Sequence, residues 1–163
     1  MKFRSLEAKD WEQVSEIYRQ GIETKNATFE LNVPSWAVWD NSHLKICRKV
    51  AELDDIIVGW YALSPVSSRC VYGGVAEVSI YVALDFNGKQ IGTKLLSHLI
   101  KESEENGIWT LQASIFPENI GSLTIHKKHG FREMGYREKI GKMEGVWRDT
   151  IILERRSKTI GIE

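Results

Sequence analysis

Residues 76–96 combine the parts of a phosphate-binding site. The apolar run EVSIYV leads into the loop DFNGKQIG, and an amphipathic segment follows in which Leu95, Leu96, Leu99 and Ile100 recur at helical spacing. A strand that runs into a glycine-containing turn at a helix start directs several unpaired backbone N–H groups toward one point. With the positive end of the helix dipole, these groups bind phosphate or pyrophosphate. On this segment alone, an ordinary strand-to-helix turn explains the pattern equally well.

A second motif favours the phosphate site. The chain contains neither G-x-x-x-x-G-K-[ST] nor G-x-G-x-x-G, which excludes a Walker loop and a dinucleotide fingerprint. Residues 119–131 read NIGSLTIHKKHGF, with Asn119 and Ser122 at a helix start and His126 further along. Over residues 76–131 the chain resembles the acetyl-CoA half of the GNAT acetyltransferase superfamily.

Shorter fragments narrow the resemblance. TFE at residues 28–30, RCVY at 69–72, EVSIYV at 77–82, Ile125-His126 and GVWRD at 145–149 stand in the order seen in phosphinothricin N-acetyltransferase-like enzymes. The resemblance implies an α/β GNAT fold, a mixed twisted sheet of about six to seven strands flanked by about four helices. Residues 1–163 are expected to form one domain, since their number suits a single core.

The resemblance also implies the residues that bind acetyl-CoA. The backbone of Ile80 and Val82 would contact the pantetheine arm, and so would Asn119, with Ser122 as a weaker candidate. The pyrophosphate would lie on the loop made of Asn87, Gly88, Lys89, Gln90, Ile91, Gly92 and Thr93.

The phosphate loop departs from the superfamily pattern. That pattern is Arg or Gln, two residues, Gly, one residue, then Gly or Ala, whereas this chain has Asn87, Gln90 and Gly92. Gln90 adds a side chain where the backbone must approach a pyrophosphate closely. Coenzyme affinity is therefore less firmly predicted than the fold.

Acetyl transfer to an amine requires the amine to lose a proton. Glu77 interrupts an apolar strand at the place where the family has a glutamate, and burial would raise its pKa into a useful range. By resemblance, His126 stands where many GNAT enzymes have a tyrosine that hydrogen-bonds the coenzyme sulfur, and an imidazole can donate a proton to a departing thiolate. The structural alternatives are a glutamate that accepts hydrogen bonds and a helix-end histidine, a role that His129 fits better.

The acceptor site is expected in other segments. By resemblance, Phe29, Arg69, Tyr72 and Trp147 face the acceptor. The planar guanidinium of Arg69 matches a carboxylate, sulfone or phosphinate oxygen pair. An exposed loop arginine without a ligand is an equally good interpretation.

Composition excludes several other classes. Lys plus Arg equals Asp plus Glu, 22 each, so no net charge favours nucleic acid or an anionic membrane. Cys47 and Cys70 have no metal-binding spacing, no metal is expected, and each is predicted to be a buried, reduced thiol. No segment has a signal core or membrane-spanning length, which favours the cytoplasm. A homodimer is expected by resemblance, with apolar surface supplied around Trp36 and Trp39.

The pattern of turns and apolar residues predicts the remaining elements. Asp10 is expected to cap the first helix, and Pro34-Ser35 starts a second that carries Trp36, Trp39, His43 and Ile46. The others are a strand at 2–4, a substrate-side loop at 24–33, a hairpin of 49–53 and 56–63, a helix end at 106–107, a strand at 109–116, a helix at 119–128, an antiparallel pair of 131–140 and 146–154 across 141–145, and a frayed tail at 157–163.

Two other functions remain open from the sequence. One is acetylation of a protein N-terminus or lysine, which requires an open peptide groove. The other is a degenerate coenzyme-binding module without turnover, which Asn87 and Gln90 suggest.

Overall fold

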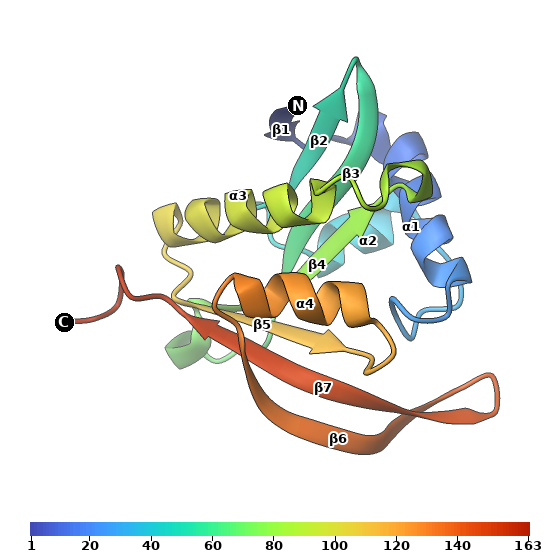
Figure 1. Cartoon of the computed structure of the whole chain (residues 1–163). Helices are drawn as coiled ribbons and strands as arrows, with labels where there is room; N and C mark the ends of the chain where they lie inside the picture. Colours follow the sequence, from blue (N-terminus) through green and yellow to red (C-terminus); the bar gives the residue numbers. More distant parts are fainter.

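Seven strands form one sheet in the order β1-β2-β3-β4-β5-β7-β6 (Figure 1). The computed structural model describes all residues from 1 to 163. The strands are β1 (Lys2–Ser5), β2 (Lys49–Leu53), β3 (Ile56–Pro65), β4 (Val75–Val82), β5 (Thr110–Ile115), β6 (Arg132–Met143) and β7 (Val146–Arg156). All neighbours are antiparallel except β4 and β5, which are parallel. The predicted mixed sheet is confirmed.

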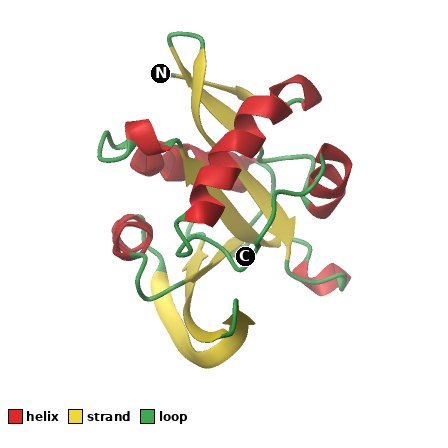
Figure 2. Cartoon of the chain, turned by 90° about the vertical axis from the view of Figure 1, so that its right-hand side faces the viewer, coloured by secondary structure: helices red, strands yellow, loops and turns green.

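Four α-helices cover the two faces of this sheet (Figures 1 and 2). They are α1 (Trp11–Glu23), α2 (Trp36–Ser42), α3 (Ile91–Glu105) and α4 (Ile120–Lys128). Leu95, Leu96 and Leu99 of α3 enter one core against Leu63 and Leu153. Because side chains alternate along a strand, neighbouring residues of β2 and β3 enter a second core under α1 and α2. That core contains Val14, Ile17, Trp39, Val50, Trp60 and Ala62.

The two parallel strands separate halfway along their length. Only Val75, Ala76 and Glu77 of β4 pair with β5. Beyond Glu77, β4 stays paired with β3 while β5 continues beside β7, and Figure 1 shows the two strands diverging. The backbone groups of residues 78–82 that face β5 therefore have no strand partner, which provides room for a ligand.

The two hairpins were predicted with unequal success. The turn between β2 and β3 is Asp54-Asp55, as predicted, and both residues have positive φ, 51° and 62°, as type I′ turns require. The expected turn at 141–145 is wrong, because β6 continues to Met143 and only Glu144-Gly145 turns. These two residues again have positive φ, 49° and 83°.

Three local predictions are wrong for reasons of packing. Asp10 stands at the N-cap position of α1, but its side chain makes no capping hydrogen bond to the helix; its carboxylate accepts from the Arg4 guanidinium at 2.7 and 2.8 Å and from the Glu7 N–H at 2.8 Å. Helix α2 ends at Ser42, so His43 and Ile46 lie beyond it. The start of the tail is not frayed, because Ser157 is 3% exposed and its hydroxyl donates to Glu104 at 2.9 Å, whereas residues 161–163 are exposed.

Candidate functional site

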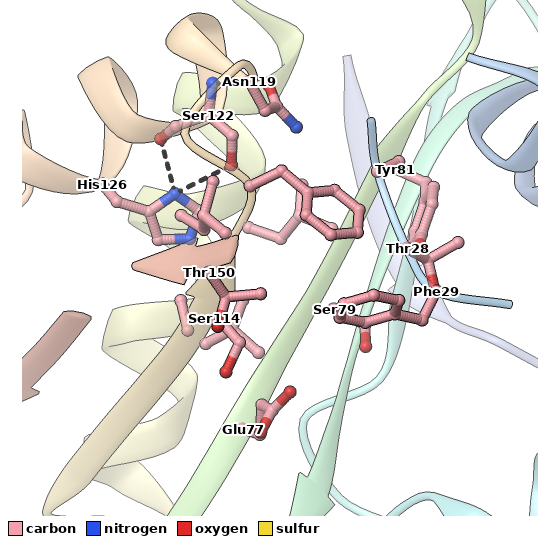
Figure 3. Close-up of a pocket in the computed structure, with 16 residues that line it drawn as sticks. Thr28, Phe29, Glu77, Ser79, Tyr81, Ser114, Asn119, Ser122, His126 and Thr150 are labelled. Atoms are coloured by element: carbon pink, nitrogen blue, oxygen red, sulfur yellow. Dashed lines mark hydrogen bonds between the residues drawn. The ribbon is translucent and has the colours of Figure 1, made fainter. Parts of the chain in front are cut away.

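A cavity of 240 Å³ opens where β4 and β5 separate (Figure 3). It is lined by residues 27–29 of the α1–α2 loop, 77–81 of β4, 113–116 of β5 and its loop, Asn119, Ser122 and His126 of the α4 segment, and Thr150 of β7. A larger groove of 740 Å³ shares part of this wall and continues to residues 86–88 and 90–93 at the start of α3. The separation of the strands thus connects the predicted phosphate loop with the predicted catalytic residues.

His126 presents one unpaired nitrogen to the cavity. Its Nδ1 lies 2.8 Å from the Ser122 carbonyl oxygen, and since a carbonyl only accepts, Nδ1 carries the proton. Nε2 is then a lone-pair acceptor in the neutral ring, and it has no partner in the protein. Burial lowers the pKa of His126, partly offset by the Ser122 carbonyl. The neutral ring is therefore the resting form near pH 7.

The hydroxyl of Thr150 is the second unpaired polar group of the cavity wall. Thr150 is 4% exposed and lies below His126 in Figure 3. A buried polar atom without a hydrogen bond costs free energy, and two residues with such atoms line the same cavity, which favours a polar group there. No signal in the sequence pointed to Thr150, which is one of several polar and apolar residues along β7.

Glu77 stands at the last paired position of β4, where the strands begin to diverge. Its carboxyl lines the cavity, and burial raises its pKa above the usual 4.5, while the charge of Arg137 opposes the rise. Glu77, Ser79 and Tyr81 alternate along β4 and share one face of the sheet. The cavity thus holds a carboxylate whose proton affinity is increased.

The start of α3 offers a row of free backbone donors. The N–H groups of Gly88, Gln90, Ile91, Gly92 and Thr93 make no hydrogen bond within the chain. Free N–H groups at the N-terminus of a fifteen-residue helix form an anion site. This arrangement fits the pyrophosphate of acetyl-CoA, with Asn87 and Lys89 in the same loop.

The two residues of this loop with positive φ are Gly88 and Gln90. Gly88 has a φ of 76°, and Gln90, the residue before α3, has a φ of 61°. The left-handed conformation explains why the superfamily pattern has glycine where this chain has Gln90. The side chain of Gln90 borders the groove but leaves the row of N–H groups free.

Gly92→Val should weaken acetyl-CoA binding by more than about tenfold. A Cβ at Gly92 would lie 3.3 Å from Cδ1 of Ile125 and 3.7 Å from Cγ2 of Val82, so a branched side chain forces α3 and α4 apart under the groove. Calorimetric titration of the folded variant measures the effect. Gly135→Val is the matched control, because nothing lies within 4 Å of its Cβ position. Equal affinity in both variants would reject the assignment of the loop.

The four predicted acceptor residues do not converge in the structure. Phe29 lines the cavity and contacts Phe116, with ring centroids 4.8 Å apart. Arg69 and Tyr72 lie before β4, outside the cavity, with the guanidinium 5.7 Å from the Tyr72 ring centroid. Trp147 is 55% exposed on the β6–β7 hairpin beside Lys142.

The two cysteines lie away from this cavity. Cys47 is buried, and burial raises the pKa of its thiol to about 12, so it is an inert core residue as predicted. Cys70 is exposed, and the prediction that it is buried is wrong.

The sequence profile of the Acetyltransferase (GNAT) domain family matches residues 3–152. This chain belongs to the GNAT acetyltransferase family. As a member, it is an N-acetyltransferase. The phosphinothricin N-acetyltransferase of Alcaligenes faecalis is 30% identical over 164 residues, covering 93% of this chain and 80% of that protein.

Two solved GNAT structures show the same fold over nearly the whole chain. The phosphinothricin acetyltransferase of Sinorhizobium meliloti in complex with acetyl-CoA is 28% identical, with a TM-score of 0.86 over 95% of this chain and 87% of that one. The ribosomal-protein-alanine N-acetyltransferase of Brucella melitensis is 25% identical, with a TM-score of 0.87 over 96% of this chain and 100% of that one. None of the helices of this GNAT protein is long and apolar enough to cross a membrane.

Proposed function

We propose that this GNAT protein transfers an acetyl group directly from acetyl-CoA to the amine of a small amino-acid-like acceptor. The supporting observation is that the cavity lined by Glu77 and the groove that reaches the start of α3 share part of their wall, including Ile80, Asn119 and His126. Phosphinothricin, methionine sulfoximine and methionine sulfone are the candidate acceptors. The similarity to the phosphinothricin acetyltransferases supports this class.

Acetyl-CoA supplies the acyl group as a thioester. The free N–H groups of residues 88–93 would hold its pyrophosphate, and the unpaired edge of Ile80 and Val82 would hold its pantetheine arm. The oxygen of the Asn119 side chain accepts from the Ser122 N–H at 3.2 Å, and its nitrogen donates to the Asn26 carbonyl at 3.1 Å. Each of these groups retains one further lone pair or proton for a ligand.

Proton transfer is assigned to Glu77 and His126. Glu77 would accept the proton of the acceptor amine, directly or through water, because its raised pKa gives the carboxylate a stronger affinity for protons. The neutral ring of His126 cannot donate through Nε2 until Nε2 has accepted a proton. An ammonium acceptor loses two protons as it becomes an amide: Glu77 takes the first before attack, and we propose that Nε2 of His126 takes the second from the nitrogen after attack and donates it to the leaving thiolate.

If Arg69 holds the acceptor, as the family resemblance implies, Arg69→Lys should raise the Michaelis constant of the acceptor roughly thirtyfold and leave that of acetyl-CoA nearly unchanged. The physical reason is that a guanidinium holds two oxygens of the acceptor at once, whereas an ammonium is a point charge. Arg69 lies outside the cavity. Arg137 is a second arginine that could bind the acceptor, because its charge acts on Glu77 in the cavity wall, and Arg137→Lys is therefore measured beside Arg69→Lys. If only Arg137→Lys raises the Michaelis constant of the acceptor, Arg137 binds the acceptor and Arg69 does not.

A competition experiment separates the small-acceptor proposal from its main rival. The similarity to a ribosomal-protein-alanine N-acetyltransferase gives the rival, acetylation of a protein N-terminus, a specific basis. We expect kcat/KM for methionine sulfone or phosphinothricin to exceed that for peptides with N-terminal alanine. Preference for the peptides would overturn the proposal, and acetyl-CoA binding without turnover would indicate the degenerate module.

The protein is also proposed to be a homodimer of cytoplasmic location. Trp39 cannot supply the apolar surface expected of it, since it is 1% exposed. Exposed apolar side chains lie instead on the β6–β7 hairpin, namely Met134, Tyr136, Ile140, Val146 and Trp147. Sedimentation should give twice the mass of the chain, and Tyr136→Lys with Val146→Lys should halve it. A monomer mass at every concentration would contradict the dimer, and cell fractionation tests the location.

A further inference from the structure

Arg148 of β7 connects three segments that are distant in the sequence. Its side chain is 12% exposed although it carries a charge. One guanidinium nitrogen donates to the Lys25 carbonyl at 2.7 Å, and another donates to the Asn26 side-chain oxygen at 2.9 Å and lies 3.4 Å from Glu118. These contacts join the hairpin to the α1–α2 loop and to the β5–α4 loop.

The guanidinium is also stacked on an aromatic ring. Its central carbon lies 4.1 Å from the ring centroid of Phe116, which is itself buried in the cavity wall. A planar group that stacks on one side and donates in its own plane is held in a single orientation. Lysine offers neither the plane nor the fork, so only arginine can make this set of contacts.

The segment held by Arg148 forms one wall of the cavity. Ala27, Thr28 and Phe29 follow Asn26 directly and line the cavity. Lys25, whose carbonyl accepts from Arg148, has the left-handed backbone conformation, with a φ of 62°. The Asn26 carbonyl in turn accepts from Asn119 of the α4 segment.

The other side of Phe29 lies against β6. A Cβ at Gly141, which pairs with Arg148, would lie 2.8 Å from the Phe29 ring. The register of β6 and β7 shifts between Arg137 and Gly141, and the Asp149 carboxylate accepts from the Lys139 N–H of this bulge at 2.6 Å. Strand β6 is thus bent so that a residue without a side chain faces the ring.

We propose that Arg148 is a positioning residue that fixes residues 25–29 as the acceptor wall and so sets affinity for the acceptor. This inference rests on the proposed function, because the acceptor enters the cavity that Phe29 lines. Arg148 does not line the cavity itself, so its effect passes through the loop. The phosphate loop on α3 does not contact it, and coenzyme binding should be independent of it.

Steady-state kinetics on methionine sulfone or phosphinothricin test the proposal. Arg148→Met should raise the acceptor Michaelis constant by about tenfold or more, since it removes hydrogen bonds from a charged donor, and change that of acetyl-CoA little. Arg148→Lys should recover less than half of the affinity for the acceptor that Arg148→Met loses. Arg132→Met is the control, because Arg132 pairs with Glu154 on the same hairpin but is 68% exposed. A fall in kcat with both constants unchanged would overturn the proposal.

Gly141→Ala perturbs Phe29 from the opposite side and keeps the proposal testable if Arg148→Met does not fold. On its own, Gly141→Ala should raise the Michaelis constant of the acceptor. Where Arg148→Met folds, the double variant should show less than the sum of the two effects, because both act through Phe29. If the effects of the two substitutions on the Michaelis constant of the acceptor are strictly additive, they do not act through the same residue, which would contradict the proposal.

Hydrogen exchange measures the loop without depending on activity. In Arg148→Met, amides of residues 24–30 should exchange at least about tenfold faster, while those of α3 stay as in the parent. Unchanged exchange in this loop would reject the positioning role. If no amine is acetylated by the parent but the loop still exchanges faster in the variant, the proposed function fails and the structural role of Arg148 stands.

Discussion

Glu77→Gln should lower kcat by about a hundredfold or more, while acetyl-CoA binding survives. The amide keeps the shape of the side chain but cannot take the proton of the amine. Burial raises the pKa of Glu77 above 4.5, so the parent rate rises with pH as this carboxyl ionises. The variant depends on amine that is already neutral, and its deficit is therefore largest at lower pH and shrinks as the amine deprotonates in solution.

A pH–rate profile with saturating acetyl-CoA checks this result. Glu133→Gln is the control, because Glu133 is an exposed carboxylate of β6 that pairs with Lys127 at 2.6 Å. If Glu77→Gln gives a profile identical to that of the parent, Glu77 is a structural residue and the base lies elsewhere.

His126→Gln is expected to lower kcat by about a hundredfold as well. Glutamine can still donate to the Ser122 carbonyl, but it cannot bind and release a proton as Nε2 does. Because burial lowers the pKa of His126 below 6.5, the acid limb that it contributes to the rate lies below this pH and should disappear in the variant. His129→Gln is a closely matched control, since Nδ1 of His129 makes the same contact with the Ile125 carbonyl at 2.7 Å, outside the cavity.

The same pKa shift has a consequence for folding stability. In the unfolded chain His126 takes up a proton near pH 6.5, whereas the native ring resists it. The stability that this group contributes to the native state is therefore present above pH 6.5 and is lost as the pH falls below it. Below pH 6.5, the free energy of unfolding of His126→Gln should fall less steeply than that of the parent. Full activity of His126→Gln would exclude the ring from proton transfer, even if the stability change is observed.

The sequence predicts what depends on local spacing. Asn119, Ser122 and His126 lie three and four residues apart, so one helix places all three on one face, and the structure shows them lining one cavity. The turn at Asp54-Asp55 and the helix end at Gly107, which has a φ of 78°, follow from the same local rules.

The rest of the site depends on long-range geometry. Thr150 joins the cavity because β7 pairs with β5. The position of Ser157 depends on Glu104, and the role of Arg148 depends on Lys25 and Asn26. None of these pairs is marked by spacing along the chain, so composition and periodicity could not reveal them.

Direct transfer to a small amine is tested most directly by mass spectrometry of a single reaction. The parent protein, acetyl-CoA and methionine sulfone or phosphinothricin are mixed, and free coenzyme A thiol, acetylated acceptor and intact protein are measured together over time. We predict that N-acetylated acceptor and thiol appear in equal amounts while the mass of the protein stays unchanged. An acetyl group retained on the protein, or thiol release without acetylated acceptor, would contradict direct transfer to a small amine.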